Sequence, residues 1–224
     1  FVRAHSIIGA RVNPRPRKVR LLRCLPRFLL LTEASSVANT IYLSFDDGPH
    51  PEYTPRVLDL LKRHGAHASF FVVGHAAEAH PDIARRIVDE GHLIGNHSYN
   101  HPRFMQIPLA EQLDQIDHAD RILAELDGKP RHRFRPPSGA LPMSLLLHCL
   151  RVRRCITYWS YDTLDYRREP KDRIVERLRT VPPVAGDILL MHDDDDRIVQ
   201  VLEEMLPEWR AAGIQMRALP EEAA

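Results

Sequence analysis

From residue 40 onward, short runs of β-branched and aromatic residues alternate with longer segments of helical period. This alternation limits the fold more than any other feature of the sequence, because it is typical of α/β domains with parallel strands. The pattern predicts seven strands, at residues 41–45, 68–73, 92–95, 131–135, 155–161, 187–191 and 214–218. It predicts six helices between them, at residues 55–64, 81–90, 109–126, 143–150, 171–181 and 197–212. Gly65 and Gly91 directly follow the first two helices, in the position where helices commonly stop.

Polar residues at the ends of the predicted strands distinguish between two possible folds, a barrel and an open sheet. Seven strands with six helices suit either a doubly wound sheet or a (β/α) barrel. Polar side chains end or follow five different strands: Asp46, Asp47, His97, Arg135, Asp162, Asp165 and His192. Residues delivered by so many strands converge on one face only where the strands encircle it. We therefore expect an α/β fold, a distorted (β/α) barrel of about seven parallel strands.

Composition narrows the class of protein. The 224 residues, 44% of them hydrophobic, are enough for one sizeable core. The longest apolar runs have four residues, against the roughly 20 of a membrane-spanning helix, which excludes a transmembrane protein. Three cysteines are too few for a disulfide scaffold, and their odd number favours a reducing compartment, so a cytoplasmic location is expected.

Charge is distributed unevenly along the chain. Residues 1–27 carry eight Lys and Arg and no Asp or Glu, whereas the rest of the chain has 23 basic and 30 acidic residues. Only four apolar residues follow, at positions 28–31, whereas the apolar core of a signal peptide has roughly 7–15 residues, so the segment is not a recognisable signal peptide. Because the sequence begins at Phe1, it leaves room for an upstream segment. We interpret residues 1–39 as a solvated basic arm, with docking to an anionic surface as the alternative. No nucleic-acid partner is expected, and nothing in the pattern sets an oligomeric state.

Two histidines four residues apart, His97 and His101 in HSYNH, form the strongest local signal. They lie about one helical turn from each other, close enough to bind one ion at Zn–N distances of roughly 2.0–2.1 Å. In a chain with 13 histidines such a pair also arises by chance. A third ligand is needed, and Asp47 in SFDDGP can supply it. Two histidines and one carboxylate leave positions open for water and substrate, as hydrolytic metals require.

The adjacent carboxylates Asp46 and Asp47 have two interpretations. Asp-Gly-Pro is a turn sequence, so the pair by itself favours a turn. The preceding strand, however, would deliver both carboxylates to the catalytic rim. One of them can then bind the metal while the other accepts a proton from the attacking water.

These residues resemble the polysaccharide deacetylases of the NodB-homology domain, carbohydrate esterase family four, over roughly residues 40–219. SFDDGP at 44–49 resembles the family's first motif, which implies that Asp46 is the general base and Asp47 a metal ligand. HSYNH at 97–101 is similar to the second motif, H-[ST]-x-x-H, whose two histidines complete the metal site. Residues 40–224 are accordingly expected to form the catalytic domain.

RPPSG at 135–139 matches the third motif, R-x-P-x-G. The resemblance implies that Arg135 orients the catalytic base and that Ser138 offers its backbone N–H to the oxyanion. Ser138 stands where an aromatic residue is common, but a backbone amide does not require that side chain. Taken alone, Arg135 could equally be a surface residue at a strand end.

DTLDY at 162–166 resembles the fourth motif, D-x-x-D-W, with Tyr166 in place of the usual Trp. LMH at 190–192 matches the fifth, L-x-H, and implies that His192 is the general acid, favoured in its imidazolium form by Asp165. Tyr166 and Leu190 are expected to contact the substrate. Taken singly, Asp165 could cap the helix near residue 171 and His192 could be a core histidine.

Four consecutive aspartates, residues 193–196, follow the proposed acid, where the family often has small residues. They can cap the helix that starts near residue 197 and complement its dipole. Alternatively, their charge raises the pKa of His192 and keeps the general acid protonated.

The resemblance implies a metal-dependent hydrolase that removes N-acetyl groups from N-acetylglucosamine residues of a polysaccharide or oligosaccharide, of chitooligosaccharide or peptidoglycan type. The cofactor is expected to be one divalent metal ion, Zn²⁺ first, with Co²⁺ or another transition metal as the alternative. An O-acetyl esterase on xylan would use the same residues, and a non-catalytic carbohydrate-binding relative would have lost Asp46 or His192. A glycosidase has no use for the two histidines, and Ser98 excludes an H-E-x-x-H protease.

Overall fold

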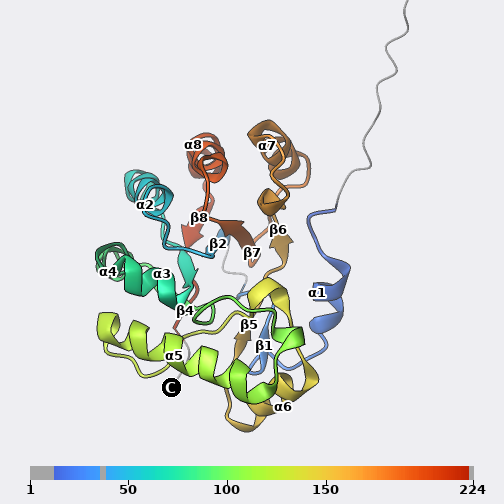
Figure 1. Cartoon of the computed structure of the whole chain (residues 1–224). Helices are drawn as coiled ribbons and strands as arrows, with labels where there is room; N and C mark the ends of the chain where they lie inside the picture. The colour runs from blue at the N-terminus through green and yellow to red at the C-terminus, as the bar shows by residue number, and fades with distance from the viewer. Residues whose placement is uncertain (1–12, 36–38, 222–224) are drawn as a thin grey trace, which may run out of the picture.

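The computed structural model describes residues 13–35 and 39–221, in which parallel strands are surrounded by helices (Figure 1). Five strands form a parallel ladder in the order β4–β3–β2–β7–β6, and β8 pairs with the first part of β2. Their bounds are β2 Thr40–Asp46, β3 Ser69–Val72, β4 Leu93–Asn96, β6 Tyr161–Asp162, β7 Ile188–His192 and β8 Gln215–Arg217. The α/β class, the parallel arrangement and most of the predicted strands are thereby confirmed.

Two predicted strands are shorter than expected. The segment 155–161 forms two short strands, β5 Ile156–Thr157 and β6, and β5 pairs with β1 Leu30–Leu31. The segment 131–135 is reduced to an isolated bridge at Phe134, between Asn96 and Ile156. Two prolines follow at 136 and 137, and they lack the N–H groups that would extend a ladder. Regular ladders therefore do not run all the way round, and the barrel is distorted at this point.

Helices cover the outside of the strands (Figure 1). Six lie close to their predicted positions: α2 Tyr53–His64, α4 Pro81–Asp89, α5 Leu109–Asp127, α6 Met143–Arg151, α7 Lys171–Thr180 and α8 Asp196–Ala211. Helix α2 is followed directly by Gly65, and α4 ends two residues before Gly91. Both glycines adopt left-handed φ angles, 63° and 78°, that glycine tolerates. Two helices of six residues, α1 Arg17–Leu22 and α3 Gly74–Ala79, were not predicted, because they are too short for a periodic signal. None of the helices described has the length and apolar composition needed to cross a membrane.

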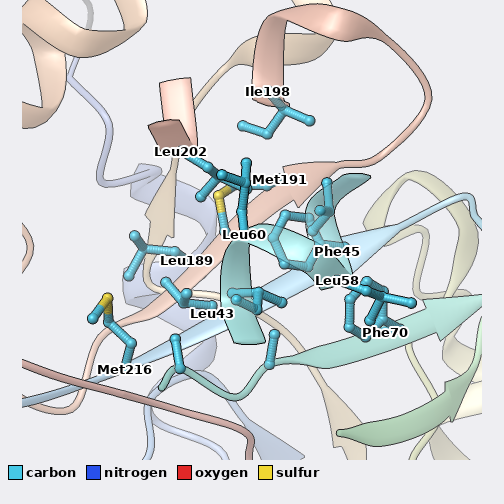
Figure 2. Close-up of a cluster of buried hydrophobic side chains, with 14 of the residues drawn as sticks. Leu43, Phe45, Leu58, Leu60, Phe70, Leu189, Met191, Ile198, Leu202 and Met216 are labelled. Carbon is cyan, nitrogen blue, oxygen red and sulfur yellow. The ribbon is translucent and has the colours of Figure 1, made fainter. Parts of the chain in front are cut away.

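Strand β2 is buried on both faces, and its alternate residues serve two different clusters. Leu43 and Phe45 belong to the outer cluster, between the strands and helices α2 and α8 (Figure 2). Tyr42 belongs to an inner cluster on the other face of the strand. Because side chains alternate along a strand, Ser44 and Asp46 share the inner face with Tyr42. The alternation therefore directs the polar residues of β2 into the barrel.

The described part of the basic N-terminal segment is not a solvated arm, so that interpretation is wrong for residues 13–35. Val19 of α1 and Leu30 of β1 are buried in one cluster with Leu145 of α6. Arg15 forms an ion pair at 2.7 Å with Asp187, whose side chain is only 3% exposed. The apolar run 28–31, which is too short for a signal-peptide core, contains the short strand β1 of the fold. Residues 1–12 lie outside the described residues.

Candidate metal and catalytic site

The carboxyl ends of neighbouring strands bring the predicted residues together. Asp46 is the last residue of β2 and pairs in register with His192, the last residue of β7. His97 directly follows β4, and β4 is separated from β2 only by β3. Parallel strands end at the same edge, so side chains that are distant in the sequence meet there.

Asp47, His97 and His101 form a compact group of possible metal ligands, with one ligand atom of each within 4.8 Å of the others. Oδ1 of Asp47 lies 3.4 Å from Nε2 of each histidine. This oxygen is buried and accepts no hydrogen bond from the described residues. An orphaned carboxylate oxygen that faces two imidazole nitrogens fits a divalent cation, which would take the place of the missing partner.

The ionisation of these groups also suits a metal. Burial opposes the charge on Asp47, but the nearby imidazoles of His97, His101 and His192 lower the pKa of the carboxyl below its usual range. Burial and the neighbouring His97 lower the pKa of His101. A carboxylate and a neutral imidazole are the forms that bind metals.

His97 is oriented by a backbone contact. Its Nδ1 lies 2.7 Å from the carbonyl oxygen of Arg135, which can only accept a hydrogen bond. Nδ1 therefore carries the proton, and the lone pair of Nε2 faces Asp47 and His101. This arrangement fixes the tautomer that a metal ligand needs.

The backbone at the proposed ligands is held in left-handed conformations. Asp47, Ser98 and His101 have φ angles of 75°, 69° and 52°, which are uncommon for residues other than glycine. The side chain of Asn96 supports the second motif, because its Oδ1 accepts a hydrogen bond from the N–H of Ser98 at 2.8 Å. Its Nδ2 donates to Asp120 at 2.8 Å. Asp47 thus lies in a tight turn and still faces the histidines, so both interpretations of the first motif apply.

Arg135 is completely buried and is not the surface residue that its position alone allowed. Its Nη1 donates to Oδ1 of Asp46 at 2.6 Å and to the hydroxyl of Ser44 at 2.9 Å, and its Nη2 donates to the carbonyl of Tyr158 at 3.0 Å. The guanidinium also lies 4.0 Å from the ring centroid of Phe71. These contacts fix the orientation of the Asp46 carboxylate and leave Oδ2 toward His97, at 3.7 Å from its Nε2.

His192 is paired with Asp165 by two hydrogen bonds. Nδ1 of His192 lies 3.0 Å from Oδ1 of Asp165, and the backbone N–H of His192 donates to Oδ2 at 2.7 Å. Burial alone would favour the neutral imidazole, but Asp165, with Asp46 and Asp47 nearby, raises the pKa of His192 to about 10. Asp165 therefore does not cap α7, which has Pro170 at its N-cap position.

Three further predicted residues, Ser138, Tyr166 and Leu190, lie at different depths. Ser138 is exposed in a short turn, with a left-handed φ of 53°. Tyr166 is half exposed. Its ring packs edge-to-face against the imidazole of His192, with 5.9 Å between the two ring centroids. Leu190 is 4% exposed within β7, so it belongs to the wall of the barrel rather than to an open groove.

The glycine of the third motif has a steric cause. Gly139 has a φ of 58°, and a Cβ atom there would lie 2.8 Å from the ring of Trp159. Trp159 is not among the predicted site residues, because nothing in the sequence places it beneath this turn.

Asp162 is another unexpected feature, since burial raises the pKa of its carboxyl to about 6.

The run of four aspartates does not act as one unit. Asp195 caps α8, because its side chain accepts a hydrogen bond from the N–H of Arg197 at 2.8 Å. Asp194 is exposed and Asp196 is the first residue of the helix. Asp193 is completely buried at the end of β7, and burial raises the pKa of its carboxyl to about 7. The capping interpretation therefore holds for Asp195 but not for Asp193.

Asp193 closes over the turn that follows Asp47. Its Oδ2 accepts a hydrogen bond from the hydroxyl of Thr54, and Thr54 Oγ1 accepts one from the N–H of His50 at 2.7 Å. A Cβ atom on Gly48 would lie 2.5 Å from both carboxylate oxygens of Asp193. Glycine is therefore needed at position 48 for this close approach. The sequence motif contains the glycine, but no local pattern indicates its distant partner.

Comparisons with known proteins agree with the motifs. The profile of the family described as polysaccharide deacetylase matches residues 34–149. The chain is 34% identical to a peptidoglycan-N-acetylglucosamine deacetylase of Bacillus cereus, over 80% of this chain and 66% of that protein. It is 32% identical to a chitooligosaccharide deacetylase of Bradyrhizobium sp., over 88% of this chain and 97% of that protein. The solved structure of the peptidoglycan N-acetylglucosamine deacetylase Bc1960 has a TM-score of 0.80 and 32% identity, covering 86% of this chain and 91% of the other. The chain therefore belongs to the polysaccharide deacetylase family.

Proposed function

We propose that the protein is a metal-dependent hydrolase that removes N-acetyl groups from N-acetylglucosamine residues of a polysaccharide or oligosaccharide and releases acetate. The observation that carries this proposal is the position of Asp46 and His192 in register on β2 and β7, beside the Asp47, His97 and His101 group. The named activities of the curated relatives support the same substrate class.

Each proposed role follows from the atom that remains available. Asp47, His97 and His101 would hold a divalent ion, which supplies Lewis acidity at the reacting carbonyl and the attacking water. Oδ1 of Asp46 is engaged by Arg135, so Oδ2 is the atom that accepts the proton of the attacking water. The backbone N–H of Ser138 is proposed to stabilise the oxyanion.

His192 is proposed to protonate the amine leaving group. Its Nδ1 is engaged by Asp165, so Nε2 is the atom that donates. A pKa of about 10 keeps the imidazole protonated at neutral pH, as a general acid requires. A carboxylate base and an imidazolium acid in the same site can then act at one pH.

Zn²⁺ is our proposal for the metal, because two imidazole nitrogens and one carboxylate oxygen are a common catalytic zinc set. Metal analysis of the purified protein would test this choice, and stoichiometric Co²⁺ or another ion in place of zinc would contradict it.

We also propose a cytoplasmic location, supported by the cysteine count alone. Cell fractionation would test that proposal, and recovery outside the cytoplasm would contradict it.

The decisive experiment compares acetate release from N-acetylated chitooligosaccharides, peptidoglycan and acetylxylan. We expect release from at least one N-acetylated glycan, loss of that release after the metal is stripped, and recovery when a divalent transition metal is added. Release from acetylxylan alone would indicate an O-acetyl esterase instead. Full activity of the demetallated protein would contradict the metal-dependent reaction.

A further inference from the structure

Two segments of the chain contain no acidic residue. Residues 1–32 hold eight Lys and Arg, and residues 128–161 hold seven. The structure brings their described parts together, since α1 shares a buried cluster with α6 and β1 pairs with β5. Figure 1 shows α1 and α6 on the same side of the barrel. We call the surface of these two segments the basic flank.

The basic flank carries cations that are not neutralised. Six of its basic side chains are exposed and form no ion pair with a carboxylate of the described residues: Arg17, Lys18, Arg27, Arg131, Arg151 and Arg153. Three of them, Arg27, Arg131 and Arg153, line a groove of about 1090 Å³ together with Phe28, and the one carboxylate in its lining, Glu221, pairs with Lys129 at 2.7 Å. Exposed arginines elsewhere in the described residues, such as Arg121 and Arg210, also form no ion pair, but they lie in segments that hold Asp and Glu, whereas the two segments of the flank hold none.

The same flank is unusually apolar. Eight large hydrophobic side chains are exposed among the described residues, and five of them lie here: Leu21, Phe28, Met143, Leu147 and Leu150, from 43% to 75% exposed. On α6, residues 143, 147 and 150 follow a helical spacing and form a second apolar face, while Leu145 and Cys149 point into the core. Nothing in the described structure covers that second face.

We propose that the basic flank docks on the surface of an anionic lipid bilayer. Anionic headgroups attract clustered Lys and Arg, and exposed Leu, Met and Phe side chains insert between the acyl chains. A hydrated polyanion would engage the cations but leave the aliphatic side chains in water. A second copy of the chain on the same face would bring cations against cations.

The position of the flank is compatible with catalysis. Asp46 and His97 lie at the carboxyl ends of their strands, whereas Arg131 and Arg153 lie just before the Phe134 bridge and β5. Docking through these two arginines would therefore leave Asp46 and His97 facing away from the bilayer. Lys18 of the same flank instead lies near the proposed site, because its Nζ donates to the carbonyl of Gly139 at 2.9 Å, next to Ser138. The proposal does not depend on the reaction that the site performs.

The test is sedimentation of the full 224-residue chain with large unilamellar vesicles. We expect binding to phosphatidylcholine vesicles that contain about one third phosphatidylglycerol, binding about tenfold weaker to pure phosphatidylcholine, and release as salt is raised. Equal binding to both vesicles, or no binding to the anionic ones at low salt, would overturn the proposal.

Variants separate the two components of the surface. Leu147→Glu combined with Leu150→Glu, and Arg151→Gln combined with Arg153→Gln, should each weaken binding about tenfold. Val184→Glu is the matched control, because Val184 is 57% exposed and lies outside both segments, so its binding should be unchanged. Thermal unfolding and acetate release from a dissolved oligosaccharide verify that each variant is folded.

Other occupants of the flank give different results. In one such result, the leucine double variant binds anionic vesicles as the unmodified protein does, while the arginine double variant does not. The surface would then recognise charge alone, and its partner would be a soluble polyanion instead of a bilayer. If the protein forms a dimer that the leucine pair abolishes, a second copy covers the face. Either result would overturn the bilayer proposal.

Discussion

The carbonyl oxygen of Arg135 lies 2.7 Å from Nδ1 of His97, while the guanidinium of the same arginine bonds Asp46 at 2.6 Å. One buried residue thus contacts both a proposed metal ligand and the proposed base. Only the contact with Asp46 depends on the side chain, because the other uses the backbone. The two contacts can therefore be separated by substitution.

Arg135→Lys should lower kcat on an N-acetylated glycan by about 10²-fold, because a lysine cannot keep the same set of hydrogen bonds to Asp46 and its neighbours. The affinity for the metal should change little, since the carbonyl that orients His97 remains. Metal titration and initial rates measure the two effects. A large loss of metal affinity in a folded variant would show that the side chain also organises the metal ligands.

Asp46→Asn and Asp47→Asn should behave differently, although the residues are adjacent. Asp46→Asn should keep the metal and lose turnover by roughly 10²–10⁴-fold, because an amide cannot accept the proton. Asp47→Asn should bind the metal more weakly, since a neutral amide replaces the carboxylate that faces both histidines. Metal content and rate are measured on the same samples. The reverse pattern would exchange the two assignments.

The sequence predicts the long elements and the grouping of the motifs, for identifiable reasons. Helices such as α2 and α4 have a clear period and a glycine just after them, and the buried strands are short apolar runs. The five motifs follow the ends of strands, so the barrel alone places Asp46, His97 and His192 together. Short elements such as α1 and β1 have no periodic signal and form through contacts with α6 and β5.

Interactions between distant residues could not be predicted. Asp193 belongs to an acidic run that indicates a helix cap, and only the packing of β7 against the start of α2 buries its carboxyl beside Thr54. Gly139 is part of a recognisable motif, but the ring of Trp159 that excludes a larger residue comes from another segment. Such contacts depend on the tertiary structure and leave no local pattern.

Asp165→Asn should lower the pKa of His192 and move the alkaline limb of the kcat/KM profile to lower pH, because the charged partner is lost. The raised pKa also contributes stability, which is complete below the ordinary histidine value of about 6.5 and is lost as pH rises through about 10. Asp194→Asn is the matched control and should leave the limb in place. An unmoved limb in Asp165→Asn would exclude His192 as the group that controls it.

Gly48→Ala should weaken metal binding by about tenfold, because the new Cβ would lie 2.5 Å from the Asp193 carboxylate and displace the turn that carries Asp47. Gly213→Ala is the control for general strain, since Gly213 has a φ of 72° and no atom within 4 Å of the added Cβ. That variant should lose stability and keep its metal affinity. Thr54→Val should act like Gly48→Ala, and Thr54→Ser should restore binding. Equal metal affinity in all four variants would contradict a role of this contact at the metal site.

Asp193→Asn should reduce the dependence of stability on pH. The pKa of Asp193 in the folded protein is about 7, above the ordinary value near 3.8, so the folded state holds this proton more tightly than the unfolded state. The free energy of unfolding should therefore fall as pH rises from about 4 to about 7, by up to about 4 kcal/mol from this group, and the loss should persist above pH 7.

Asparagine keeps a carbonyl oxygen for the hydroxyl of Thr54 but has no proton to release. Urea unfolding of the demetallated proteins is measured at several pH values between 4 and 8, for the unmodified protein and for Asp193→Asn. Each series gives the slope of unfolding free energy against pH, and the contributions of all other groups cancel in the difference between the two slopes. A smaller decline in Asp193→Asn is expected even if its buried amide lowers stability at every pH. Identical slopes would mean that Asp193 stays ionised in the folded protein despite its burial.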